Sequence, residues 1–223
     1  MLTNHQITIL EKSLPFYPQL TADEKTLLID NATAKRYIKG QSIFQADNDC
    51  LGILIVESGS LRTYITSEDG KEITLYRLQD NEICIFGATC ILDSIDFDVN
   101  IDAETDCTII QLSSMILQKL TTNNIYVELF AYKLATERFS DIMWAMQQIL
   151  FMSFDRRLAT FLLEEAQKQG SLDIKMTHEQ IAKHLGSARE VVSRMLSYFA
   201  KEGYVSLSRG HILLIDKNAL YKL

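Results

Sequence analysis

The fold of this protein is decided by residues 177–194, which read THEQIAKHLGSAREVVSR. Thr177 begins the capping-box pattern T-x-x-Q, which predicts a helix that starts after it and ends at Gly186. Ser187 begins a second box, S-x-x-E, which predicts another helix directly after the glycine. Two short helices joined by a tight glycine turn form a helix-turn-helix.

The second of these helices carries side chains suited to reading DNA bases. Arginine can donate two hydrogen bonds to guanine, glutamate can accept one from cytosine, and a serine hydroxyl can contact either kind of base edge. The predicted base contacts are Arg189, Glu190, Ser193 and Arg194. Further DNA contacts are predicted for Ser187 and Thr177, which lie near helix N-termini, and for Arg209. The alternative is a solvated face whose charges form ion pairs within the helix.

The sequence around this motif predicts a winged domain. Before it, Ser153 can cap a helix that ends at Gly170. After it, residues 204–207 and 211–215 are typical of strands joined by a turn that contains Arg209. The charge pattern agrees, because residues 151–223 hold 11 Lys and Arg against 8 Asp and Glu, whereas residues 1–150 hold 11 against 21. A polyanion is therefore expected to bind at the C-terminal end.

Residues 34–112 have a different, strand-like pattern. Short runs at 53–56, 61–66 and 73–78 combine β-branched and aliphatic residues and are separated by turn sequences. Several short strands at this spacing predict an antiparallel sandwich or barrel. Residues 1–30 are predicted to form packing helices, with a break at 15–18 and a capping box that starts at Thr21.

A long helix with a heptad repeat is predicted between these parts. Apolar positions follow one another by four and three residues: Ile125, Leu129, Tyr132, Thr136, Phe139, Met143, Met146 and Leu150. Such a seam favours a parallel dimer of two helices. Alternatively, the helix packs on its own sheet through a second face that includes Phe130, Leu134 and Trp144.

Composition excludes several classes of protein. The 223 residues are 47% hydrophobic and 23% charged, with only 9 Gly and 2 Pro, which is typical of a folded globular chain. No apolar run approaches the roughly 18 residues of a membrane span, and no signal peptide opens the chain, so a cytoplasmic location is expected. The four Cys form no CxxC pair and are expected to be reduced. No enzyme motif is found.

The motif at 186–194, with its preceding helix and following hairpin, closely resembles the recognition module of the CRP/FNR superfamily of bacterial transcription regulators. The resemblance extends over nearly the whole chain and implies an α+β fold in three parts. These are a β-roll like a cyclic-nucleotide-binding domain at 1–122, a dimerisation helix at 123–152 and a winged helix-turn-helix at 153–223. It also implies that Arg189, Glu190 and Arg194 read bases, with Ser193 contacting a base as in the FNR branch. A homodimer on a pseudo-palindromic DNA site, and contact with RNA polymerase, are expected.

The sequence departs from this family where cyclic AMP binds. Ile85-Phe86 stands where the ligand-binding Gly-Glu pair would be, and Asp93–Asp98 contains three carboxylates and no cation. Ile142-Met143 replaces the Thr-Ser pair of the long helix. Cyclic AMP is therefore not expected as the ligand, and a purely cyclic-nucleotide-binding signalling protein is kept only as the second hypothesis. An iron–sulfur cluster is not expected without N-terminal Cys.

Two kinds of signal stay open. One is an apolar effector in a pocket formed by Ile85, Phe86, Phe139, Ile142 and Met143. The other is redox chemistry, or a soft metal, at Cys84 and Cys90, against the simpler interpretation that these are buried structural cysteines. No other metal site is predicted.

Overall fold

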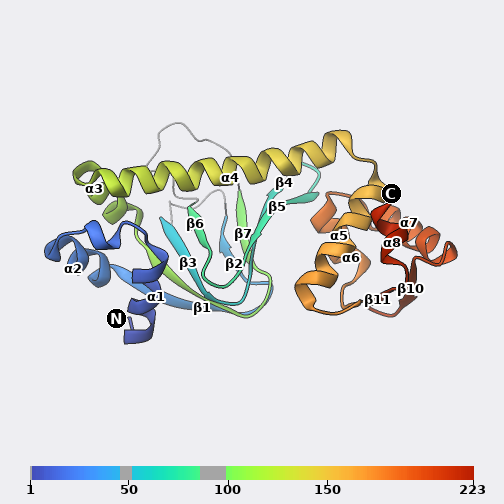
Figure 1. Cartoon of the computed structure of the whole chain (residues 1–223), viewed down its shortest axis with the longest axis horizontal. Helices are drawn as coiled ribbons and strands as arrows, with labels where there is room; N and C mark the ends of the chain where they lie inside the picture. The colour runs from blue at the N-terminus through green and yellow to red at the C-terminus, as the bar shows by residue number, and fades with distance from the viewer. Residues whose placement is uncertain (1, 46–51, 86–98) are drawn as a thin grey trace. The chain divides into compact units, whose positions relative to one another are not determined.

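The computed structural model describes residues 2–45, 52–85 and 99–223, and the chain has the predicted α+β fold (Figure 1). It forms two compact units. The first comprises Met1–Ile65 and Leu75–Ile142, and the second comprises Thr66–Thr74 and Met143–Leu223. Among the described residues, no helix is both long enough and apolar enough to cross a membrane.

The first unit begins with short helices, as predicted. Helix α1 spans Asn4–Ser13, the 3-10 helix η1 spans Tyr17–Gln19, and α2 spans Ala22–Asp30. The capping box at Thr21 is formed: the Glu24 amide donates to Thr21 Oγ1 at 3.3 Å, and the Thr21 amide donates to Glu24 Oε2 at 2.8 Å.

Eight strands in the described part of the chain build the β-roll that the sequence predicts. In chain order they are β1 (Ala32–Tyr37), β2 (Ser42–Phe44), β3 (Ile53–Ser58), β4 (Leu61–Thr66), β5 (Glu72–Leu78), β6 (Ile83–Ile85), β7 (Asn100–Ala103) and β8 (Cys107–Leu112). They form two four-stranded sheets with the orders β1-β8-β3-β6 and β2-β7-β4-β5.

Strand β3 shows why the roll has two cores. Its first four residues are all buried, because both faces of the strand are covered. Alternate side chains point to opposite faces of a sheet, so Leu54 and Val56 join the core of the roll. Ile53 and Ile55 face the other way and pack with residues of α1, α2 and the helices after the roll.

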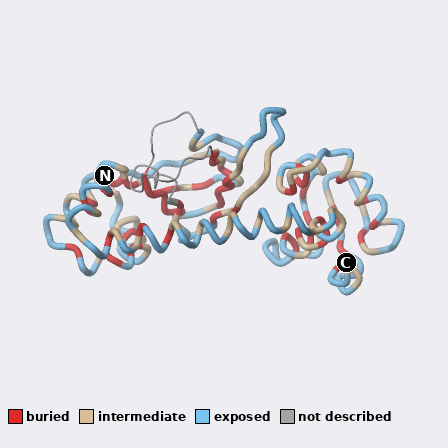
Figure 2. The backbone as a smooth tube through the Cα atoms, turned by 90° about the horizontal axis from the view of Figure 1, so that it is seen from above, coloured by how far each residue is buried: buried red, intermediate tan, exposed pale blue. Residues whose placement is uncertain are grey.

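Helix α3 (Ser114–Asn123) leads into the long helix α4 (Ile125–Phe151), which has 27 residues. Phe130 and Leu134 of α4 pack against the first unit's core, as the second-face hypothesis predicts, whereas Trp144 is 56% exposed. The large apolar heptad positions are exposed in the single chain, from 45% for Met143 to 67% for Ile125 and Leu150. Figure 2 shows the backbone of α4 coloured largely as exposed or intermediate. The helix therefore has one face on its own roll and a separate apolar stripe without a covering layer.

The second unit is a winged helical domain. It contains α5 (Phe154–Gln169), β9 (Asp173–Ile174), α6 (His178–Leu185), α7 (Arg189–Lys201), β10 (Val205–Ser208), β11 (His211–Leu214) and α8 (Lys217–Tyr221). The predicted hairpin is β10–β11, and β9 extends it to a three-stranded sheet. No pattern in the sequence predicted β9, which has only two residues. Val192, Leu196 and Phe199 of α7 are fully buried in this unit's core.

Candidate DNA-binding interface

The helix-turn-helix is held by a cap at each end of α6. The Gln180 amide donates to Thr177 Oγ1 at 3.2 Å, and the Thr177 amide donates to Gln180 Oε1 at 2.8 Å. At the other end Gly186 adopts φ +60°, a left-handed conformation that glycine adopts without steric cost. This cap ends the first helix and turns the chain directly into the second.

The predicted capping box at Ser187 is wrong. Helix α7 begins at Arg189 with Ala188 as its N-cap, and no side chain caps it. The reason is that the Ser187 amide donates to the Ala182 carbonyl oxygen at 3.0 Å, so Ser187 belongs to the closing turn of α6. Ser153 does occupy the N-cap position of α5, but its hydroxyl makes no capping hydrogen bond to the helix backbone.

The outer face at the start of α7 carries the predicted base-reading residues. Arg189, Glu190 and Arg194 are exposed, and Ser193 is half-buried. Within the described part of the chain, none of the three charged groups forms an ion pair, even though Glu190 and Arg194 are four residues apart. The alternative of a face neutralised by intrahelical pairs is therefore not what the structure contains, and these donors and acceptors point to solvent.

The other predicted contacts lie around this face. The Thr177 hydroxyl already donates to Gln180 Oε1 at 3.1 Å, so its first role is to cap α6. Ser187 is half-buried, and Arg209 is exposed in the turn of the wing beside Gly210, which has φ +77°. On the wing, His211 Nδ1 lies 3.0 Å from Asp173 Oδ2, which ties β11 to β9.

A titratable group, His178, lies beside the predicted base-reading residues, and no motif in the sequence marked it. His178 is the first residue of α6, and burial together with the positive charge of Arg189 lowers its pKa from the usual 6.5. Its imidazole is therefore held towards the neutral form beside a predicted base-reading arginine. The only sequence signal was its place directly after the cap at Thr177.

The predicted effector residues are spread over the first unit and along α4. Phe139 is 62% exposed and Met143 is 45% exposed, whereas Ile142 is half-buried. Ile85 is in β6, and Phe86 lies outside the described residues.

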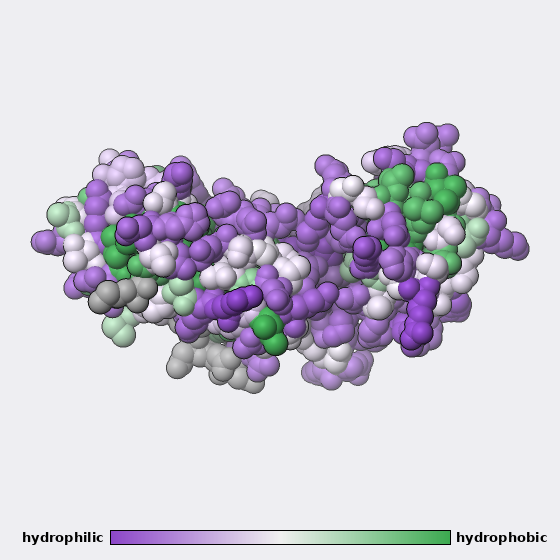
Figure 3. Space-filling view, turned by 90° about the horizontal axis from the view of Figure 1, so that it is seen from below, coloured by the Kyte–Doolittle hydropathy of each residue, from purple (hydrophilic) through white to green (hydrophobic). Residues whose placement is uncertain are grey.

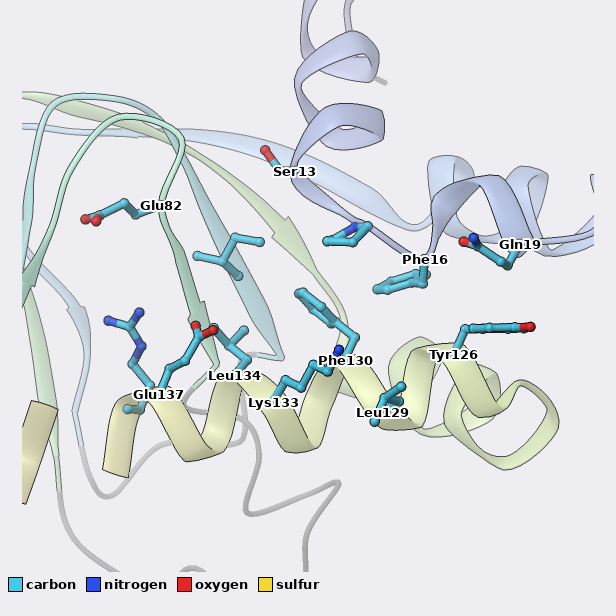
Figure 4. A pocket seen from close by; sticks show the side chains of 13 residues that line it. Ser13, Phe16, Gln19, Glu82, Tyr126, Leu129, Phe130, Lys133, Leu134 and Glu137 are labelled. Carbon is cyan, nitrogen blue, oxygen red and sulfur yellow. The ribbon is translucent and has the colours of Figure 1, made fainter. Parts of the chain in front are cut away.

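A described cavity of the first unit lies elsewhere (Figure 4). It is a groove of about 500 Å³ between the segment Ser13–Gln19, the start of β6 and one side of α4. Phe16 and Phe130 meet edge to face in it, with ring centroids 5.1 Å apart. Lys133 and Glu137 lie along its α4 side, whereas Phe139, Ile142 and Met143, the effector candidates whose side chains are described, are not among its lining residues.

The structure describes one of the two cysteines predicted as a possible redox pair. Cys84 is fully buried in the core of the roll, next to Tyr76, whose pKa is raised well above 10 by burial and by the nearby thiol. Cys90 lies outside the described residues. A fully buried thiol behaves as a small apolar side chain, which is what the simpler interpretation of Cys84 expects.

The site and fold together define a class of protein: a DNA-binding regulator with a β-roll and a winged helix-turn-helix. Residues 34–124 match the cyclic nucleotide-binding domain, and residues 156–223 match the Crp-like helix-turn-helix domain. A solved structure of a CRP/FNR-family transcriptional regulator from Eubacterium rectale is 44% identical, covers 95% of this chain and 98% of its own, and has a TM-score of 0.91. The chain therefore belongs to the CRP/FNR family of transcription regulators.

More distant relatives cover the chain almost completely. The cyclic AMP receptor protein of Thermus thermophilus is 26% identical over 204 residues, which are 90% of this chain and 92% of that protein. Electron transport regulator A of Shewanella oneidensis is 25% identical over 228 residues, covering 97% and 88%. Members of this family are transcription regulators that bind DNA and are not enzymes.

Proposed function

We propose that this regulator binds DNA as a homodimer, with two copies of α7 entering successive major grooves of a pseudo-palindromic site about 34 Å apart. The observation that carries the proposal is the solvent-facing set Arg189, Glu190 and Arg194 at the start of α7, without ion-pair partners among the described residues. Free guanidinium and carboxylate groups at the N-terminal end of a recognition helix are suited to base edges. Ser193 adds a hydroxyl, Thr177 and Ser187 are proposed to contact phosphates, and Arg209 is proposed as a further DNA contact.

The homodimer is supported by the apolar stripe of α4. Leu129, Tyr132 and Phe139 are 47%, 52% and 62% exposed, although they repeat at heptad spacing over several turns. A large exposed apolar surface of this kind marks an interaction site, and a heptad seam selects another helix as its partner. A second copy of α4 supplies an identical seam, which a twofold axis would place opposite the first.

The signal is proposed to be a small apolar molecule that acts on the face of α4 carrying Phe139, Ile142 and Met143. Full burial of Cys84 makes the thiol alternative the weaker one. A ligand can change DNA binding only through different affinities for the two arrangements of the dimer. Ile142→Asp is expected to remove effector-dependent DNA binding while the dimer persists, and an unchanged response would overturn this assignment.

The second candidate is a cyclic-nucleotide response, which the match of residues 34–124 to the cyclic nucleotide-binding domain favours. The apolar pair Ile85-Phe86 argues against it, because a cyclic phosphate needs nearby hydrogen-bond donors and positive charge. Isothermal titration with cyclic AMP distinguishes the two: binding at micromolar concentration would favour the cyclic nucleotide, and absence of heat favours a different effector.

Contact with RNA polymerase, in the cytoplasm, completes the proposal. The C-terminal unit has exposed apolar surface, as the space-filling view illustrates (Figure 3). Leu172, Leu213 and Ile215 are 45%, 41% and 58% exposed, and the Leu214 amide donates to the Leu172 carbonyl oxygen at 2.9 Å, so these residues are neighbours. Apolar patches of this kind are suited to a protein partner.

The test of the DNA proposal is site selection from random duplexes, followed by binding measurements on the selected site. Arg194→Ala is expected to weaken binding by about 1 to 3 kcal/mol per half-site and to relax the base preference at one position of each half. Lys222→Ala, which removes an exposed cation elsewhere in the same unit, is the control and should leave the base preference unchanged. Equal loss on all sequences would assign Arg194 to phosphate instead.

A further inference from the structure

The flanks of the α4 stripe carry opposite charges. With Leu129 and Thr136 at the a positions of the heptad and Tyr132 at d, Glu128 falls at g and Lys133 at e. Glu128 is half-buried and Lys133 is exposed, on the rim of the groove in Figure 4. Neither has an ion-pair partner within residues 2–45, 52–85 and 99–223.

These two side chains cannot pair within one helix. Five residues along an α-helix correspond to a rotation of about 140°, which places Glu128 and Lys133 on opposite sides of the apolar stripe. Neighbours on a helix surface are three or four residues apart. Glu128 has no basic residue three or four positions away on α4, and Lys133 forms no ion pair with Glu137, which lies four residues further on. A partner for the Glu128 carboxylate must therefore come from outside its own helix.

A second copy of the chain meets this need. In a parallel pair of helices, the g residue of one helix faces the e residue of the next heptad in the other, and such pairs set partner choice and orientation. We infer that the Glu128 carboxylate of one protomer binds the Lys133 ammonium of its partner, twice per dimer, and that this pair fixes the parallel orientation and register of α4. The inference rests on the proposed homodimer.

The charge pattern discriminates against the antiparallel arrangement. Reversing one helix brings g opposite g and e opposite e, so that carboxylate meets carboxylate and ammonium meets ammonium. The apolar seam does not itself select a parallel or an antiparallel orientation. The hydroxyl of Thr136 needs no partner from the other helix, because it donates to the Tyr132 carbonyl oxygen at 2.9 Å in its own helix. Orientation is thus decided by the flanks, and only the parallel form places two winged units at the same end of the dimer.

The experiment is sedimentation equilibrium of the full chain with Glu128→Lys, Lys133→Glu and the double exchange. Each single exchange replaces two attractive contacts by two repulsive ones and is expected to weaken dimerisation about tenfold, or about 1.4 kcal/mol. The double exchange should return to within about twofold of the original. Asp30→Lys is the control, since it makes the same charge change at an exposed position at the end of α2, outside the long helix.

Mixing the two single variants adds a second readout. A heterodimer of Glu128→Lys with Lys133→Glu contains two attractive pairs, so the variants should prefer each other to themselves, which native mass spectrometry measures directly. If both single variants dimerise within about twofold of the original, the ion pair is wrong while the homodimer stands. Single variants that weaken without recovery in the double exchange or the mixture would show a fold defect and overturn the pair. A chain that stays monomeric at every concentration would overturn both the pair and the homodimer.

Discussion

Replacing Phe139 with alanine should separate the dimer without disturbing the folded chain. Phe139 exposes 62% of its surface in a single chain and lies in the apolar stripe of α4. Complete burial of a phenylalanine side chain contributes up to about 3 kcal/mol, so covering the exposed part contributes about 1.9 kcal/mol per protomer on the same scale. A dimer buries two Phe139 side chains, and alanine keeps a small part of this contribution. The substitution should therefore weaken dimerisation by about 3 kcal/mol, or about 150-fold in the dissociation constant.

A matched control is available on the same helix. Phe130 is nine residues earlier but packs on the core of its own chain, edge to face with Phe16. Phe130→Ala should therefore lower the free energy of unfolding by about 2 kcal/mol and change the dissociation constant little while the chain remains folded. Phe139→Ala should raise the dissociation constant. It should change the free energy of unfolding little when unfolding is measured at concentrations where both proteins are monomeric.

Sedimentation equilibrium measures the dissociation constant, and urea unfolding followed by circular dichroism measures the free energy of unfolding. Unfolding must be compared at low concentration, because dimerisation itself stabilises the folded state by mass action. If Phe139→Ala dimerises within twofold of the original protein, the stripe is not the interface. The assignment of the apolar heptad stripe of α4 to a dimer interface would then be wrong, while its packing on the chain's own core would stand.

Two further predictions concern the winged unit. Because His178 has a lowered pKa, the unfolded chain binds more protons between that pKa and 6.5, so stability should fall as pH falls through this window and be fully present above it. In Arg189→Ala, an NMR titration should find the pKa of His178 raised yet still below 6.5, since burial remains; an unchanged pKa would show that Arg189 does not act on it. Thr177→Ala removes a formed cap and should lower the free energy of unfolding by about 1 kcal/mol, whereas Ser187→Ala should change it by less than about 0.5 kcal/mol. A larger loss at Ser187 would mean that it caps α7 in place of Ala188.

Local patterns predicted much of the DNA-binding unit because their causes are local. The box at Thr177 and the glycine at 186 act over three or four residues, so the sequence was enough to place α6 between them. The same rule failed at Ser187, where two helix ends compete for one residue. Its amide closes α6, and the N-cap of α7 therefore moves to Ala188. Sequence spacing alone does not show which end takes the residue.

In the long helix and the groove beside it, too, some features were predicted from the sequence and others depended on tertiary packing. The heptad stripe and the second face of α4 were both visible in the sequence because helical periodicity assigns side chains to faces. Which face meets the chain's own core depended on packing: Leu134 is buried against that core and Phe139 is exposed. The groove joins Phe16 to Phe130 across more than a hundred residues, and no periodicity connects such distant segments.

The sequence by itself determined the order of elements, the winged helix-turn-helix, the residues on its outer face and the family resemblance, because these follow from short-range patterns. Only the tertiary structure decided that the charged groups at the start of α7 lack ion-pair partners in the described chain, that Cys84 is fully buried, and that His178 is influenced by Arg189. Burial and electrostatic environment depend on what other segments place around a residue. Those segments are brought together only when the chain folds.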